Sequence, residues 1–148
     1  MATEPVVALR DVADADLAVF FANQADDEAA RMAAVPSRGR AAFDAHWRAI
    51  LADPAVTVRT IVADGEVAGN VLRFARDGVV EVGYWLGREF WGRGIASRAL
   101  AQFVALLDER PLRAAVAEHN PASMRVLEKC GFVRREIEGG MVVFELVA

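Results

Sequence analysis

The sequence predicts an α+β fold in which seven strands form one mixed sheet, in the order β-α-α-β-β-β-α-β-α-β-β. Two Asp-Gly pairs, at 64–65 and 77–78, separate three strand-like apolar segments, and such pairs favour tight antiparallel hairpins. A helical segment then follows the third of these strands, which favours a crossover to a parallel partner. The sheet is therefore expected to be antiparallel through strands two to four and parallel between strands four and five.

The N-terminal part of the chain predicts one strand and two helices. The strand covers 6–9, and Asp14 or Asp16 can cap the first helix. A helical pattern continues over 22–55 but is interrupted at 36–40, where proline and glycine occur. The apolar residues after this break recur at i, i+4, i+7 and i+8, namely Phe43, Trp47, Ile50 and Leu51.

The remaining elements follow without a linker or repeat. Apolar strands are expected over 56–63, 66–75 and 79–86. Next come a helix over 94–108, a strand over 113–117, a helix over 121–130, and a hairpin of strands 132–138 and 141–147 that turns at Gly139-Gly140.

The composition is that of one domain without an excess of positive charge. The 148 residues are near the commonest domain size, and 17 basic against 21 acidic residues give a net charge of −4. Nucleic acids and anionic membranes are therefore not expected as partners. The chain has no run of 18 apolar residues and begins without a signal-peptide pattern, so we expect a single cytoplasmic domain over 1–148, monomeric or homodimeric.

A metal centre is not expected from the sequence. Cys130 is the only cysteine, which excludes an internal disulfide and a cysteine cluster. His46 and His119 lie far apart in the sequence and belong to no metal-ligand pattern. Cys130 is expected to be a small core residue.

A glycine-punctuated turn over 91–96 provides the strongest functional signal. It follows the apolar strand 79–86 and leads directly into a helix, whose first N–H groups lack intrahelical partners at the positive end of the macrodipole. Gly92 and Gly94 allow the backbone to approach an anion, and Arg93 adds a cation with five donors. The turn therefore predicts a phosphate or pyrophosphate site.

Two common phosphate motifs do not fit this turn. A dinucleotide fingerprint needs glycine or alanine where Ser97 stands and an acidic residue about twenty positions later, where the chain has Pro-Leu-Arg. The mononucleotide loop is absent. The pattern W-G-x-G-x-A instead resembles the pyrophosphate signature of the GNAT superfamily of acyl-CoA N-acyltransferases, with Gly94 and Ala96 in its glycine and Gly/Ala places. Trp91 replaces the usual Gln or Arg, as in the branch that acetylates ribosomal-protein N-termini.

A second segment, 120–132, resembles the superfamily pattern N-x-x-S/A followed by L-x-x-x-G-F. The local chemistry agrees, because Asn120 suits a helix N-cap, Pro121 suits the first turn, and Gly131 suits a C-terminal stop. The resemblance implies a GNAT fold whose fourth and fifth strands splay apart to form an acyl-CoA cleft. The residues that it implies for contact with acetyl-CoA are Tyr84, Trp85, Leu86, Trp91, Gly92, Arg93, Gly94, Ile95, Ala96, Ser97, Asn120 and Ser123.

The implied reaction is direct attack of a primary amine on the acetyl thioester in a ternary complex. Glu81 is the candidate base, because it is the only carboxylate between Val79 and Leu86; the alternative is a strand-end carboxylate in a salt bridge or at the pocket rim. For the thiolate's acid, many relatives have a tyrosine where this chain has Leu127, so Ser123 is the candidate. Its alternative role is that of a first-turn helix residue.

The acceptor is not identified by these motifs. A protein N-terminus and a small-molecule amine both fit the resemblance. Asp26, Asp27 and Glu28, followed by Arg31 and Met32, either border the acceptor site or form a solvated helix face. Two other functions stay open: a non-catalytic acyl-CoA-binding sensor or interaction domain, and a transferase of a different acyl group.

Overall fold

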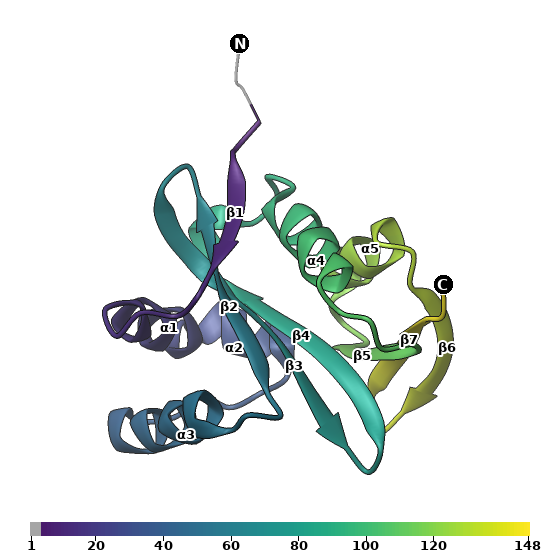
Figure 1. Ribbon diagram of the computed structural model, residues 1–148, viewed down its shortest axis with the longest axis horizontal. Helices are drawn as coiled ribbons and strands as arrows, with labels where there is room; N and C mark the ends of the chain where they lie inside the picture. The colour runs from purple at the N-terminus through teal and green to yellow at the C-terminus, as the bar shows by residue number, and fades with distance from the viewer. Residues whose placement is uncertain (1–3) are drawn as a thin grey trace.

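The computed structural model describes residues 4–148. It contains a single seven-stranded sheet with helices on both faces (Figure 1). The first three residues, part of the N-terminal segment that lacks a signal-peptide pattern, lie outside the described residues. The elements are β1 (Val7–Arg10), α1 (Asp16–Ala25), α2 (Asp27–Ala33), α3 (Arg40–Ala52), β2 (Thr57–Ala63), β3 (Glu66–Arg76), β4 (Val79–Leu86), η1 (Arg88–Phe90), α4 (Ile95–Ala105), β5 (Leu112–Ala117), α5 (Pro121–Lys129), β6 (Val133–Glu138) and β7 (Met141–Leu146).

The sheet order is β1-β2-β3-β4-β5-β7-β6, and the pairing is antiparallel except between β4 and β5. This confirms the predicted α+β class and the parallel pairing of the fourth and fifth strands. The Asp-Gly and Gly-Gly turns are also where they were expected, because Gly65, Gly78, Gly139 and Gly140 all have positive φ angles.

Two predictions about the N-terminal helices were wrong. Three helices precede β2 instead of two, because Asp26 has an extended backbone that ends α1 and its side chain accepts a hydrogen bond from Ala29 N at the start of α2. Neither Asp14 nor Asp16 caps α1. Asp16 is instead buried, where it accepts hydrogen bonds from Arg10 and from Thr60 Oγ1.

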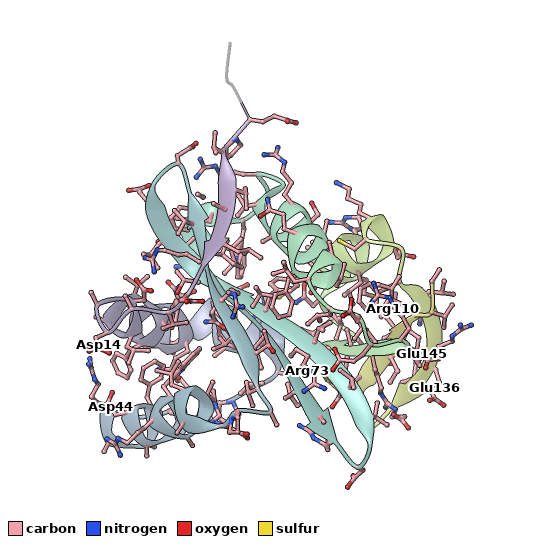
Figure 2. All side chains as sticks on the ribbon, in the orientation of Figure 1. Asp14, Asp44, Arg73, Arg110, Glu136 and Glu145 are labelled. Carbon is pink, nitrogen blue, oxygen red and sulfur yellow. The ribbon has the colours of Figure 1, made fainter. Side chains whose placement is uncertain are left out.

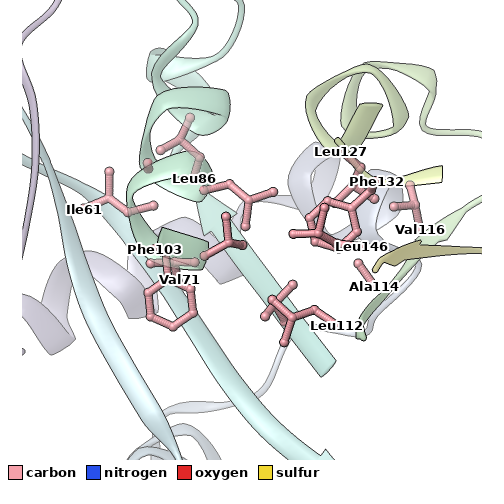
Figure 3. Packing of buried hydrophobic residues seen from close by; sticks show 14 of the residues in the cluster. Ile61, Val71, Leu86, Phe103, Leu112, Ala114, Val116, Leu127, Phe132 and Leu146 are labelled. Atoms are coloured by element: carbon pink, nitrogen blue, oxygen red, sulfur yellow. The ribbon is translucent and has the colours of Figure 1, made fainter. Parts of the chain in front are cut away.

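The hydrophobic core has two parts, one on each face of the sheet. The larger part joins α4 and α5 to β2–β5 and β7, and it includes Leu86, Phe103 and Leu127 (Figure 3). The smaller part lies under α1 and α3, where the Phe20 and Trp47 ring centroids are 4.9 Å apart. Burying each such side chain contributes about 1.5–3 kcal/mol.

The predicted stripe on α3 is confirmed only in part. Phe43 and Trp47 are buried and Ile50 packs against them, but the side chain of Leu51 is exposed. Charged side chains lie around the outside of the molecule, for example Asp14 and Glu136 (Figure 2).

The strands β4 and β5 separate almost immediately after they pair. Glu81 and Arg113 form their one registered pair, whereas β5 and β7 are paired along six residues. The carboxyl halves of β4 and β5 therefore diverge and leave a gap in the middle of the sheet. The predicted splaying of the fourth and fifth strands is confirmed.

Gly69 of β3 positions the end of β4. A Cβ atom at this position would lie 1.9 Å from the carbonyl oxygen of Trp85, so only glycine permits the close approach of the two backbones. β3 and β4 continue as a pair up to Gly69 and Leu86. This contact sets where β4 ends beside the gap.

Candidate functional site

A cavity of about 430 Å³ fills the gap between β4 and β5. Its walls include Met32 of α2, on one face of the sheet, and Ile95 of α4 and Val126 of α5, on the other. The cavity is thus lined by residues from both faces of the sheet. The residues from the sequence-based set that line it are Tyr84, Trp85, Leu86, Trp91, Gly92, Gly94, Ile95, Ala96, Ser97, Asn120 and Ser123.

The N-terminus of α4 is the electropositive part of this wall. Gly92 and Gly94 have φ angles of 72° and 75°, which only glycine adopts readily, and Gly94 is the N-cap. No side chain caps the helix, and its first turn carries no acidic residue. The first amide groups of α4 are therefore available to an anion.

Arg93 departs from its sequence-based expectation. Its guanidinium Nη2 lies 3.7 Å from Asp64 Oδ2 on the turn between β2 and β3, and its Cζ lies 5.8 Å from the Phe90 ring centroid. Arg93 is not among the residues that line the cavity. The carboxylate of Asp64, which does not line the cavity, attracts the guanidinium away from the cavity, and the Phe90 ring adds a cation–π contact.

Two cations that the sequence analysis missed lie in the cavity wall. Arg125 and Lys129 are one helical turn apart on α5, and both line the cavity. Within the described residues neither forms an ion pair with a carboxylate. Their i, i+4 spacing places them on one helix face and was the signal available in the sequence.

Tyr84 and Ser123 meet across the cavity. Tyr84 Oη and Ser123 Oγ lie 2.7 Å apart and form a hydrogen bond between β4 and the first turn of α5. Burial raises the pKa of Tyr84, and the hydrogen bond with Ser123 opposes that shift. The sequence analysis assigned Tyr84 to contact along the strand and missed its hydroxyl group.

Asn120 holds the beginning of α5 and ties it to α2. Its Oδ1 accepts a hydrogen bond from Ser123 N at 3.2 Å, so Asn120 is the N-cap, as the local sequence predicts. Its Nδ2 donates to the carbonyl oxygen of Met32 at 3.3 Å. His119 Nε2 lies 2.5 Å from the carbonyl oxygen of Arg31. Both contacts fix the end of α2 beside the cavity.

The two tryptophans near the end of β4 have different roles. Trp91 Nε1 donates to the carbonyl oxygen of Leu86 at 2.9 Å and so fastens the turn to the strand. This bond engages the carbonyl group of Leu86, one of the β4 residues that the resemblance implies for contact with acetyl-CoA. Trp85 Nε1 is buried and has no hydrogen-bond partner within the described residues, although the residue lines the cavity.

Glu81 does not line the cavity. Its carboxylate lies 3.9 Å from Arg113 Nε and 3.8 Å from Arg76 Nε, and its side chain is 13% exposed. The position is three residues before Tyr84, about 10 Å along the strand. The carboxylate thus lies within ion-pair range of two arginines, as in the alternative role that the sequence left open, and its role as the base stays a prediction. No Asp or Glu within residues 4–148 lines the cavity.

The wall formed by α2 is apolar. Ala29, Met32 and Ala33 face the cavity together with Met141 of β7. The acidic residues beside this wall are neutralised within the chain: Asp26 lies 3.2 Å from Arg88, and Glu28 lies 2.5 Å from Arg31. Two of the three acids of the rim expected from the sequence, Asp26 and Glu28, are thus paired within the chain, whereas Asp27 has no ion-pair partner among the described residues.

The other titratable candidates lie outside the cavity wall. Burial raises the pKa of the Cys130 thiol, whose Sγ donates to the carbonyl oxygen of Ser97 at 3.3 Å. Residues 4–148 contain no group of three or more His, Cys, Asp or Glu side chains arranged to hold a metal ion. None of the helices in this range combines the length and the hydrophobicity needed to cross a membrane.

Comparison with known proteins gives one family and one fold. A family model described as an acetyltransferase (GNAT) domain matches residues 7–133. Among solved structures, a GNAT-family acetyltransferase from Bacillus anthracis is 12% identical, with a TM-score of 0.82 over 98% of this chain and 96% of that one. A search of curated sequences gives no significant match.

Two further solved structures contain coenzyme A. An aminoglycoside acetyltransferase is 19% identical, with a TM-score of 0.79 over 95% of this chain and 93% of that one. RimL, an alpha-N-protein acetyltransferase of a ribosomal protein, is 17% identical, with a TM-score of 0.78 over the same shares, 95% and 93%. At these identities the likeness is one of fold.

Proposed function

The chain belongs to the GNAT acetyltransferase family and uses acetyl-CoA, and we propose that it transfers the acetyl group to a primary amine in a ternary complex. The acceptor is a protein or peptide N-terminus or a small amine of similar basicity. The observation that carries this proposal is the cavity between β4 and β5, because its lining comes from both faces of the sheet and so has room for two substrates on different sides.

The residues on the α4 side fit a CoA thioester. The uncapped first turn of α4, next to Gly92 and Gly94, suits the pyrophosphate. Arg125 and Lys129 supply charge for the phosphates, and each charge-assisted hydrogen bond contributes about 1.5–3 kcal/mol. The diverging half of β4 suits the pantetheine arm, which can bind like an added strand.

The thioester is already an activated acyl donor, so the protein's part is to position the amine and to manage protons. No carboxylate from the described residues lines the cavity, so the amine has to arrive neutral or to lose its proton to water. An α-amino group has a pKa of about 7.8 and is about a quarter neutral at pH 7.4. A lysine-type amine, with a pKa of about 10.4, is neutral in about one molecule in a thousand.

At pH 7.4 the neutral fraction of an α-amino group is thus about 300 times that of a lysine-type amine. Weakly basic amines are therefore favoured even without any specific contact to the protein. The apolar wall of Ala29, Met32 and Met141 also suits an uncharged group beside the amine. Asp26 and Glu28, which are paired within the chain, offer little to a polycation. The proposed acceptor is therefore an α-amine, or another weakly basic amine, that carries an apolar substituent.

An acceptor panel tests the proposal. The panel contains a peptide with a free N-terminus and an apolar first residue, the same peptide N-blocked with one internal lysine, a polyamine and an aminoglycoside, and release of the CoA thiol is measured. We expect turnover with the free N-terminus to exceed that with the blocked peptide by at least about 100-fold at neutral pH. Preferred turnover of the polyamine would reject the proposed acceptor class. Binding of acetyl-CoA without turnover of any amine would favour the non-catalytic alternative.

A further inference from the structure

The hydrogen bond between Tyr84 and Ser123 places two hydroxyl groups at the point where β4 and β5 have parted. Their oxygen atoms are 2.7 Å apart. Both residues line the main cavity, and both also line a smaller cavity of about 100 Å³ behind it, between β4 and β5. Tyr84 is the only tyrosine of the chain.

We propose that Tyr84 donates a hydrogen bond to Ser123, the acid that the family resemblance implies for the thiolate of CoA, so that the two hydroxyl groups act as one proton-donating unit. This inference rests on the proposed acetyl transfer. Ser123 is then the catalytic residue, and Tyr84 is a positioning residue that acts through it.

The surroundings of the pair support this assignment. Apart from these two hydroxyl groups, the side chains around the smaller cavity are aliphatic, including Val82, Leu100 and Leu127. A hydrogen bond in such surroundings is stronger than in water, because the local dielectric constant is low. Asn120 Oδ1 accepts from the backbone N–H of Ser123, which leaves the Ser123 hydroxyl to Tyr84 and the cavity. Burial also raises the pKa of Tyr84, so its hydroxyl stays protonated at neutral pH.

The proton balance is complete without another reactant. The amine forms a C–N bond to the acetyl carbon, and the C–S bond then breaks with its electron pair on sulfur. Ser123 gives its proton to the sulfur and receives one from Tyr84. The proton shed by the new amide nitrogen returns through water to the hydroxyl pair. One amine and one thioester become one amide and one thiol, and both hydroxyl groups end as they began.

A titration of bound CoA tests the unit independently of any acceptor. The ultraviolet absorbance of the thiolate gives the pKa of the bound thiol. Hydrogen bonds from the pair stabilise the thiolate, so we expect Ser123→Ala and Tyr84→Phe each to raise that pKa, by about 0.5 to 1 for Ser123→Ala and by less for Tyr84→Phe. Ser123→Thr keeps the hydroxyl and should restore the wild-type value. An unchanged thiol pKa in both deletions overturns the inference.

Kinetics with the accepted amine provide the second test. We expect each deletion to lower kcat by about 10-fold to 100-fold while KM for acetyl-CoA changes little, and the double variant to be no slower than the slower single variant. Ser37→Ala, which removes an exposed hydroxyl outside the cavity, is the matched control with unchanged kcat. Multiplicative losses in the double variant would show that the two hydroxyl groups act separately and would overturn the unit.

The single tyrosine allows a variant that keeps the ring intact. Global incorporation of fluorotyrosine makes the phenol of Tyr84, and of no other residue, more acidic. A stronger donor behind Ser123 should lower the pKa of the bound thiol, and a purely structural tyrosine would leave it unchanged. A shifted thiol pKa in an enzyme that turns over no amine would keep the hydroxyl unit and reject the proposed function, so the two failures are distinguishable.

Discussion

Glu81 Oε1 lies 3.9 Å from Arg113 Nε, across the one residue pair that joins β4 to β5. The two side chains therefore mark the closed end of the gap in which the cavity lies. Arg113 also pairs with Glu138, and Arg76 lies on the other side of Glu81. The carboxylate thus belongs to a small ionic network at the base of the splayed strands.

This network predicts a structural role for Glu81. Glu81→Gln should leave kcat/KM within about threefold of wild type, because the carboxylate does not reach the cavity, and should lower the free energy of unfolding by about 1 kcal/mol through loss of the ion pairs. Steady-state kinetics and denaturant unfolding measure the two effects. A loss of about 100-fold in kcat/KM with unchanged stability would make Glu81 the general base after all.

Gly94 is expected to be essential for CoA binding. Gly94→Asp forces a side chain into a backbone with φ of 75° and places a negative charge at the helix terminus that should receive the pyrophosphate. The increase in Tm that acetyl-CoA gives to the wild type should disappear. Gly78→Asp is the matched control: its φ is 77°, it lies in the turn between β3 and β4, and it should keep the ligand-induced increase. Equal ligand responses in both variants would contradict the assigned site.

Arg125 and Lys129 should contribute to CoA affinity through charge. Alanine at either position is expected to weaken CoA binding by about 10-fold, and the loss should shrink at high salt. Arg93→Ala should change the affinity less than about twofold, because that guanidinium faces Asp64. Isothermal titration with CoA at two salt concentrations measures all three. A larger loss for Arg93 than for Arg125 would restore the sequence-based assignment.

Lys129 also gives a chemical test, since it is the only lysine of the chain. An amine-reactive reagent can modify this side chain and the N-terminal amine and no other amine of the protein. Bound CoA should protect Lys129 from labelling, whereas the N-terminal amine should react at an unchanged rate; peptide mass spectrometry separates the two sites.

Gly69 should be required for the close packing of β3 against the end of β4. Gly69→Ala places a Cβ 1.9 Å from the Trp85 carbonyl oxygen, so one of the two backbones has to move, and we expect a loss of about 2–3 kcal/mol in the free energy of unfolding. Gly83→Ala on β4 is the control, because a Cβ there meets nothing within 4 Å and should cost less than about 1 kcal/mol. Similar stability of the two variants would contradict the close approach at Gly69.

Local signals predicted the parts of the site that depend on neighbouring residues. The cap formed by Asn120 and the left-handed glycine before α4 were both found from the sequence, because cap and turn chemistry act over a few positions. The break at Asp26 was missed, since a helical pattern continues across it. Its extended backbone was not marked by proline or glycine.

Contacts between distant segments could not be predicted in this way. The direction of Arg93 depends on Asp64, and the ion pairs of Glu81 depend on Arg113; both partners come from other strands or turns. The Tyr84–Ser123 bond joins residues 39 positions apart. Alternation along a strand defines the face on which Tyr84 lies but not the helix that this face meets, and only the tertiary structure defines that neighbour.

The separation of β4 and β5 divides the sheet into two blocks, β1–β4 and β5-β7-β6, that share one residue pair. Helix α4 packs against strands of the first block and against α5, which packs on the second. The cavity therefore lies at the junction of the two blocks, and the tilt between the blocks sets its width. Substitutions in the core between α4 and α5, remote from any ligand, can thus change the activity by widening or narrowing the cavity between β4 and β5.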